Sequence, residues 1–248
     1  MASEDEPVLI EETRGTIRIL TLNRPAKRNA LNTALTTALH DALLEADADA
    51  DIRAVVLAGK GKSFCAGADL AEFNDFTPKN QDAVVRRSYL TSDTQSLLQR
   101  ISKPVVSAVQ GAAAGGGAGL AVGCDMMVAA SDLRLFYPEV GHSIVPAIVM
   151  TGLQRQLNRK LAFEVISTGK VINAEEALEH GLANRVCEPG DVLDTALEIA
   201  GVWARAAPIA MATTKSLFYR VADLPFEAAM AAGRDVNGLM RGFRDQSK

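Results

Sequence analysis

The sequence predicts an α/β fold with parallel strands. Runs of β-branched and apolar residues, typical of buried strands, alternate with longer stretches of helical periodicity. Tight glycine-rich loops follow two of these runs. Parallel strands need long crossover connections, usually helices, so this alternation favours a parallel sheet covered by helices. A chain of 248 residues is long enough for one domain of this kind or for two small ones.

The predicted strands lie within the first 130 residues of the chain. Arg14 and Gly15 form a turn between the first two strands, and Asn32 caps a helix whose leucines, four residues apart, form an apolar stripe. A second helix is expected to end near Arg100, and the glycine-rich tract starts a third at about residue 117. Strands are expected at residues 8–12, 16–22, 53–58, 104–109 and 126–130.

Toward its C-terminus the chain becomes helical in pattern. Asn173 and Glu176 have the spacing of a capping box, and Pro208 suits the first turn of a helix. We therefore expect a core at residues 1–190 and a helical C-terminal portion at residues 191–248.

Composition narrows the class of protein. Hydrophobic residues make up 48% and charged residues 23%, so a core can form, and the net charge of −4 gives no global signal of nucleic-acid or membrane binding. Cys65, Cys124 and Cys187 lack the spacing of a zinc site or a disulfide framework. The N-terminus is acidic and lacks the apolar segment of a signal peptide. We expect reduced thiols, a cytoplasmic location, no bound metal and no prosthetic group.

One local charge pattern differs from this background. Arg24, Lys27 and Arg28 cluster around Pro25. On a mildly acidic chain such a cluster can hold a phosphorylated small molecule, or it can serve as solubilising surface charge.

The tract GAAAGGGAGL, from Gly111 to Leu120, is open to several interpretations. As a dinucleotide-binding loop it matches GxxxGxG, but it follows an earlier strand–helix–strand passage, whereas that fingerprint belongs on the first strand. No tyrosine is followed by a lysine four residues later, as a short-chain dehydrogenase requires. A P-loop would end in GK[ST] and a nucleophile elbow would read GxSxG; neither occurs, and Ser143 lies in GHSIV.

The remaining interpretation of the glycine tract is an oxyanion hole. The segment SFCAGADL, residues 63–70, and the tract at 111–120 each follow a β-branched strand. Their backbone N–H groups can therefore converge on one carbonyl oxygen. Glycine suits this role because it lets a ligand approach the backbone closely.

Five segments, in order, resemble the crotonase superfamily, the enoyl-CoA hydratases and isomerases. They are NRPAKRNAL, RAVVLAGKGKSFCAGADL, KPVVSAVQGAAAGGGAGLAVGCDMMVAA, FYPEVG and INAEEALEHGLANRV. The resemblance covers nearly the whole chain. It implies a spiral of ββα turns with a helical C-terminal part, assembled as a homotrimer or a dimer of trimers, and an acyl-CoA thioester as substrate, with coenzyme A as part of that substrate.

The resemblance also implies roles for particular residues. The N–H groups of Ala68 and Gly116 would bind the thioester oxygen, Ala66 would lie near the adenine ring, and Lys27 and Arg28 would lie near the CoA phosphates. The other residues implied for the CoA site are Asp69, Leu70 and, from a C-terminal helix, Lys215 and Phe218. For Asp69 a hydrogen-bonding role within its loop is also expected. For the last two, the alternative is a surface lysine and a core phenylalanine.

Carboxylates distinguish the reactions of this family. Its hydratases carry one Glu two residues after the GGG run and a second Glu further on, in a sequence similar to FGxPE. Here Glu139 supplies the second carboxylate, whereas the first position is Gly119. A single carboxylate beside an oxyanion hole suffices to move a proton between C2 and C4 of an acyl-CoA. We therefore predict double-bond (Δ3,Δ2) isomerisation of an enoyl-CoA, with Glu139 as acid and base.

Several alternatives stay open from the sequence. The chain can be a 2-enoyl-CoA hydratase of fatty-acid or branched acyl-CoA breakdown, an enzyme of another crotonase chemistry, or a CoA-binding protein with little catalysis. Glu72 or Asp75, on the segment expected to line the acyl pocket, can replace the missing acid. Asp125 and Asp132 flank a buried strand and are expected to be structural.

Overall fold

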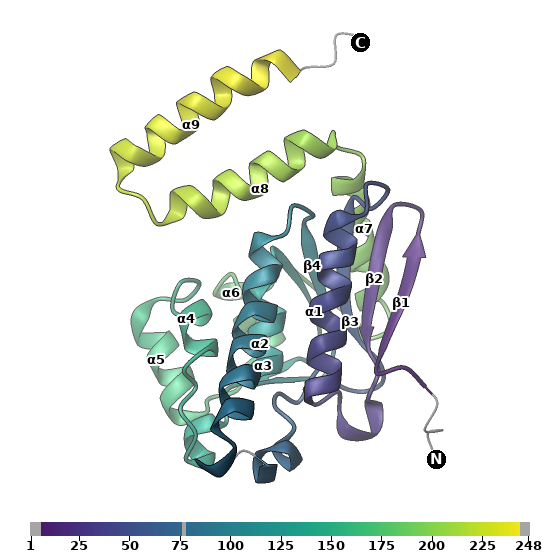
Figure 1. Cartoon of the computed structure of the whole chain (residues 1–248), viewed down its shortest axis with the longest axis vertical. Coiled ribbons are helices and arrows are strands. Elements are labelled where there is room, and N and C mark those ends of the chain that lie inside the picture. The colour runs from purple at the N-terminus through teal and green to yellow at the C-terminus, as the bar shows by residue number, and fades with distance from the viewer. Residues whose placement is uncertain (1–5, 76–77, 244–248) are drawn as a thin grey trace.

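The computed structural model describes residues 6–75 and 78–243, and its central element is a sheet that runs through the body of the molecule (Figure 1). Within these residues the sheet has six strands in the order β1-β2-β3-β4-β6-β9. The first pair is antiparallel and every other pair is parallel, which confirms the predicted α/β class. The strands are β1 (Leu9–Arg14), β2 (Ile17–Leu22), β3 (Ala54–Gly59), β4 (Val105–Val109), β6 (Met126–Ala130) and β9 (Arg185–Cys187).

A second, small sheet joins segments that the sequence pattern does not predict as strands. It contains β5 (Ala112–Ala114), β7 (Arg134–Phe136) and β8 (Ile172–Asn173). With three residues or fewer, these strands are too short to show the alternation of apolar and polar residues that identifies a strand. Because β5 and β7 run parallel, the residues that follow each of them emerge side by side.

The two faces of the large sheet are covered by different helices. Alternate residues of the central strands, such as Leu57 and Val105, belong to one hydrophobic cluster. This cluster also contains residues of α1 (Thr33–Ala48), α2 (Gln81–Arg100) and α3 (Gly116–Gly123). Val56 and Val106 face a second cluster with α7 (Val192–Ala204). Each central strand is therefore buried on both sides, as expected of parallel strands.

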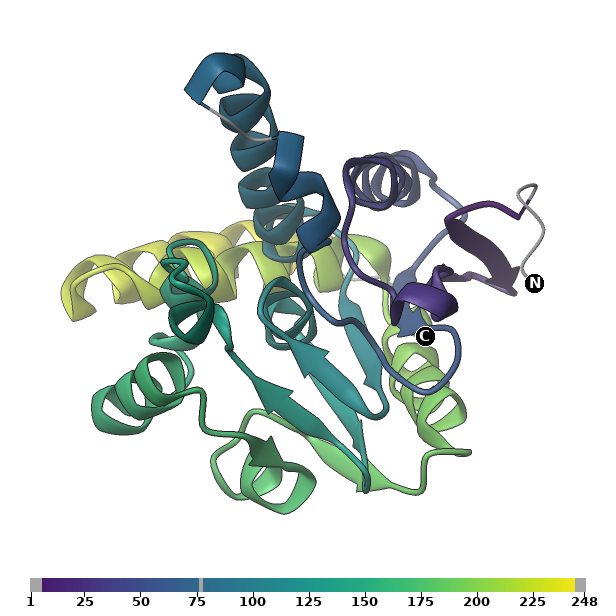
Figure 2. The same ribbon diagram turned by 90° about the horizontal axis from the view of Figure 1, so that it is seen from below.

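Side-chain caps fix the starts of two predicted helices. Asn32 accepts a hydrogen bond from the backbone N–H of Leu35 at 2.9 Å, at the start of α1. Asn173 and Glu176 form the expected capping box at the start of α6 (Ala174–Glu179), with hydrogen bonds of 2.9 and 3.1 Å. Two further helices, α4 (Val149–Leu153) and α5 (Arg159–Thr168), lie between β7 and β8 in the sequence. Viewed from below, the first turns of α2 extend beyond the rest of the molecule (Figure 2).

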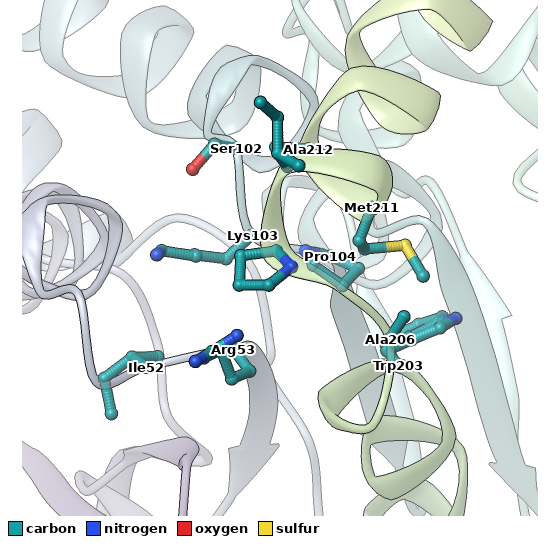
Figure 3. Close-up of a pocket in the computed structure, with 11 residues that line it drawn as sticks. Ile52, Arg53, Ser102, Lys103, Pro104, Trp203, Ala206, Met211 and Ala212 are labelled. Carbon is teal, nitrogen blue, oxygen red and sulfur yellow. The ribbon is translucent and has the colours of Figure 1, made fainter. Parts of the chain in front are cut away.

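The C-terminal helices do not all lie apart from the sheet. The expected boundary at residue 191 falls before α7, yet α7 packs on the sheet through Val192, Ala196 and Ile199. In contrast, α8 (Pro208–Ala222) and α9 (Phe226–Met240) extend beyond the end of the sheet (Figure 1). A cavity of about 230 Å³, lined by Lys103, Trp203 and Met211 among others, lies near the connection from α7 to α8 (Figure 3).

None of the helices in the described ranges combines the length and apolar character needed to cross a membrane.

Candidate active site

A cavity of about 890 Å³ brings together most of the residues predicted for the site. Those that line it are Lys27, Ala66, Ala68, Asp69, Leu70, Gly116 and Glu139. Arg28, Lys215 and Phe218 do not line it.

The two glycine-rich loops meet at one end of this cavity. Cys65 and Ala113 form an isolated parallel bridge: the N–H of Cys65 donates to the carbonyl of Ala112 at 3.1 Å, and the N–H of Ala114 donates to the carbonyl of Cys65 at 2.9 Å. At Gly67 the loops touch, because a Cβ there would lie 3.5 Å from the backbone nitrogen of Gly116. The tertiary contact between the loops is therefore made by backbone atoms.

Two backbone N–H groups at this junction are free to bind a ligand. Gly116 is the first residue of α3, so its N–H has no acceptor within the helix. In the described part of the chain, neither this N–H nor that of Ala68 donates to a protein acceptor. Both residues line the cavity. Fixed donors of this kind, one of them at a helix N-terminus, can stabilise an oxygen that gains negative charge.

At two positions of the glycine tract, another part of the chain lies so close that a residue with a side chain would not fit. Gly115 has φ +50°, and a Cβ there would lie 2.6 Å from Oε1 of Glu139. A Cβ on Gly117 would lie 2.4 Å from the carbonyl oxygen of Cys65, in the partner loop. Gly115 thus makes room for the carboxylate, and Gly117 lets the two loops touch.

The carboxylate of Glu139 is placed by the small sheet. The N–H of Gly115 donates to the carbonyl of Phe136 at 2.9 Å, which holds the end of β7 beside the glycine tract. Three residues later, Glu139 starts a short 3-10 helix (Glu139–His142). Its Oε2 is buried and has no hydrogen-bond partner within the described residues. Burial raises the pKa of Glu139, while its own backbone N–H and the nearby His142 act in the opposite direction.

This raised pKa leads to an expected pH profile. If catalysis needs Glu139 ionised, kcat/KM falls as the pH drops through the raised pKa, so the acidic limb lies above the value of about 4.3 for free glutamate. The measurement is kcat/KM against pH with a CoA thioester substrate. His142→Gln removes a positive charge that favours the carboxylate, so it should move this limb to higher pH. A limb at or below pH 4.3 would contradict the burial argument.

The basic residues around Pro25 differ in their contacts: Arg24 binds other parts of the protein, whereas Lys27 is available to a ligand. Arg24 pairs with Asp69 at 2.9 Å and also donates to the carbonyl of Ala30. Asp69 accepts from the N–H of Ala71 at 3.2 Å, which agrees with its expected role within the loop. Lys27 is exposed and lines the cavity, whereas Arg28 is exposed but lies outside the lining, with a left-handed φ of 49°.

The surroundings of Lys215 and Phe218 are the reverse of those expected for a surface lysine and a core phenylalanine. The lysine is buried: its Nζ donates to the carbonyls of Leu98 and Lys103 at 2.6 and 2.8 Å and pairs with Asp125 at 2.8 Å. Phe218 is 67% exposed. The expectation of a surface lysine and a core phenylalanine is therefore wrong. Lys215 anchors α8 to one carbonyl in the last turn of α2 and to another just beyond it.

The buried contacts of Lys215 lead to a second testable prediction. Lys215→Met should reduce the stability of the protein by about 3 kcal/mol, because it leaves Asp125 partly buried without its cation. The melting temperature should fall, whereas KM for a CoA thioester should stay within about twofold in the protein that remains folded. Lys170→Met, which removes a more exposed ion pair, is the matched control. A raised KM without loss of stability would instead support the CoA-binding role that the resemblance implies.

Three of the other acids considered from the sequence, Glu72, Asp125 and Asp132, have partners within the fold. Glu72 lines the cavity, but its carboxylate accepts hydrogen bonds of 2.8 and 3.0 Å from the N–H of Thr33, at the start of α1. The side chain of Asp75 lies outside the described part of the structure. Asp125 accepts from the N–H of Val105 at 2.6 Å, and Asp132 accepts from the N–H of Gly111 at 2.9 Å. The last two are structural, as predicted.

Residues of α2 line the cavity without having been singled out from the sequence. They lie at helical spacing on one face, and they are Val84, Arg87, Ser88, Thr91 and Gln95. Val149, at the start of α4, also lines the cavity. The spacing of the α2 residues is visible in the sequence, but it is equally typical of a solvated helix face.

Fold and cavity together define a class of protein. It has a mostly parallel α/β fold, and two free amides and a carboxylate with one unpaired oxygen lie at a cavity large enough for an acyl chain. A family model described as enoyl-CoA hydratase/isomerase matches residues 12–240. The chain belongs to the enoyl-CoA hydratase/isomerase family.

Individual relatives agree with this family. A short-chain-enoyl-CoA hydratase from Clostridium acetobutylicum is 35% identical over 242 residues, which are 96% of this chain and 91% of that protein. A crotonyl-CoA hydratase from Syntrophomonas wolfei is 33% identical, covering 97% of this chain and 92% of that protein. The crystal structure of an enoyl-CoA hydratase from Mycobacterium smegmatis matches with a TM-score of 0.89 at 33% identity, covering 95% and 91% of the two chains. These matches confirm the crotonase fold.

Proposed function

We propose that this protein hydrates 2-enoyl-CoA thioesters. The observation that carries the proposal is the half-buried carboxylate of Glu139, whose Oε2 has no partner among the described residues. Glu139 lines the same cavity as the free amides of Ala68 and Gly116. The names of the relatives support hydration better than the isomerisation favoured by the sequence alone.

One carboxylate is sufficient for the addition of water. Ionised Glu139 takes a proton from water while the water oxygen bonds to C3. The C2–C3 π electrons then form a C1–C2 double bond, and the carbonyl π electrons move onto the thioester oxygen. The N–H groups of Ala68 and Gly116 stabilise this enolate oxygen. Protonated Glu139 then returns its proton to C2, which restores the carboxylate and completes the addition. The raised pKa of Glu139 suits both halves of this cycle.

Double-bond isomerisation is the second candidate, and a specific observation favours it. Gly119 leaves the site without the first carboxylate of the family's hydratases. Moving a proton between C2 and C4 needs only Glu139 and a stabilised enolate, with no water to activate. In this reaction the proton leaves C2 or C4 and returns to the other carbon.

Two substrates distinguish the candidates. Hydration lowers the ultraviolet absorbance of a conjugated 2-enoyl-CoA, whereas isomerisation raises this absorbance when a 3-enoyl-CoA is supplied. The proposal expects the first result at a turnover typical of enzymes. Conversion of the 3-enoyl-CoA alone would favour isomerisation. Binding of acyl-CoA with no turnover of either substrate would indicate a CoA-binding protein.

Self-association as a homotrimer, alone or paired, is part of the same proposal. Large apolar side chains are exposed on the helices that extend beyond the end of the sheet, among them Phe218, Phe226, Met230 and Leu239. Several large apolar side chains exposed on the same pair of helices indicate an interaction site. A second copy lying there would cover Phe218, which the resemblance implies for the CoA site. The mass in solution, measured by light scattering, tests this assembly.

A further inference from the structure

Gln95 occupies the space that a side chain on Gly119 would need. A Cβ on Gly119 would lie 2.8 Å from Oε1 of Gln95 and 3.0 Å from Cγ1 of Val149. On the other side, a Cβ on Gly116 would lie 3.9 Å from Nε2 of Gln95. The amide of Gln95 therefore lies against the place that a side chain on Gly119 would take, and near Gly116.

The amide nitrogen of Gln95 lacks a partner. Nε2 is buried and makes no hydrogen bond to any described residue. Oε2 of Glu139 is likewise buried and without a hydrogen-bond partner among these residues. Both residues line the 890 Å³ cavity. Leaving a buried polar group unpaired is unfavourable, so each of these two groups in the lining of one cavity calls for a polar partner. One group donates and the other accepts, which are the two bonds that a water molecule can make at once.

We propose that Gln95 positions the reacting water, in place of the side chain that Gly119 lacks. This inference rests on the proposed hydration. The N–H of Gln95 donates to the water oxygen, and one water proton points at Glu139. An amide cannot take up the proton, so Glu139 accepts it as the water oxygen bonds to C3 and later returns it to C2. Gln95 is unchanged at the end of the cycle.

Gln95→Ala tests the positioning role. We expect kcat for hydration to fall by about 100-fold, the order that follows from misplacing a reacting group by about 1 Å. KM and the binding of a saturated acyl-CoA should change little. A second readout is the exchange of the C2 protons of a saturated acyl-CoA with D2O, which needs Glu139 and the two amides but no positioned water. This exchange should stay near the wild-type rate and shows that the site is folded.

Gln99→Ala is the matched control. Gln99 is the same residue type, one turn further along α2, and it does not line the cavity. Its substitution should leave both hydration and C2 exchange unchanged. If Gln95→Ala hydrates as fast as the wild type, the inference about Gln95 is overturned while the proposed function stands. If the wild type exchanges C2 protons but does not hydrate, the proposed function fails, and the inference about Gln95 falls with it.

The position of Gln95 beside Gly119 can be tested independently by adding a side chain at residue 119. Gly119→Glu alone should place its side chain against Gln95 and Val149, so its hydration rate should be lower than that of the wild type. Combining it with Gln95→Ala opens the space, and the double variant should hydrate at least tenfold faster than Gly119→Glu alone. Equal rates for the single and double variants would show that Gln95 does not hold this position, and would overturn the inference.

Discussion

Replacing Glu139 with Gln should lower kcat for the CoA thioester reaction by about 10³-fold. The amide keeps the shape of the carboxylate but cannot accept or return a proton, and general acid–base catalysis typically contributes 10²- to 10⁴-fold. Oε2 of Glu139 makes no hydrogen bond to the described residues, so the substitution breaks no contact of that atom. The measurement is kcat with saturating substrate, together with the Kd of a saturated acyl-CoA, which should stay near the wild-type value.

The stability of this variant is expected to move in the opposite direction. Burial raises the pKa of Glu139 in the folded state, so the folded protein favours the protonated form, and that stabilisation is lost as the pH rises through the folded pKa. At neutral pH the ionised group therefore destabilises the fold, and Glu139→Gln should melt at the same temperature as the wild type or higher.

Glu72→Gln is the control for this experiment, because Glu72 lines the same cavity but binds the N–H of Thr33. It should lower stability and change kcat by only a few fold. A large loss of kcat in Glu72→Gln, with near-normal turnover in Glu139→Gln, would place the reacting acid at residue 72 instead.

Gly115→Ala should have the second largest effect. Its φ of +50° with ψ −120° is unfavourable for any residue with a Cβ, and the added carbon would lie 2.6 Å from Oε1 of Glu139. Backbone strain of this kind costs about 1–3 kcal/mol, and displacement of a catalytic group by about 1 Å lowers rates by about 10²-fold. We expect both a lower melting temperature and a kcat reduced by at least that factor.

Gly141→Ala is the matched control, because Gly141 lies two residues from Glu139 and a Cβ there meets nothing within 4 Å. This variant should keep both the melting temperature and kcat. The comparison separates the effect of a methyl group near the site from the effect of a methyl group against the carboxylate. If both variants behave like the wild type, Glu139 does not need the position that the structure gives it.

Local patterns determined most of the large sheet and its helices. Buried parallel strands read as continuous β-branched runs, so β3 and β4 were predictable, and Asn32 and Asn173 mark helix starts through their own side chains. The short strands β5, β7 and β9 could not be predicted, because three residues carry no periodicity and are stabilised by their neighbours in the sheet.

The sequence by itself determined the family, the two glycine-rich loops and the candidate carboxylate Glu139, because these are carried by contiguous motifs. It also determined that Gly119 brings no acid to the site. Only the tertiary structure decided what fills that space. Gln95 comes from a helix with a generic polar face, and its meeting with Gly119 depends on how α2 packs beside α3. Likewise, burial of Lys215 and exposure of Phe218 follow from where α8 lies, because accessibility is a property of packing and not of residue type.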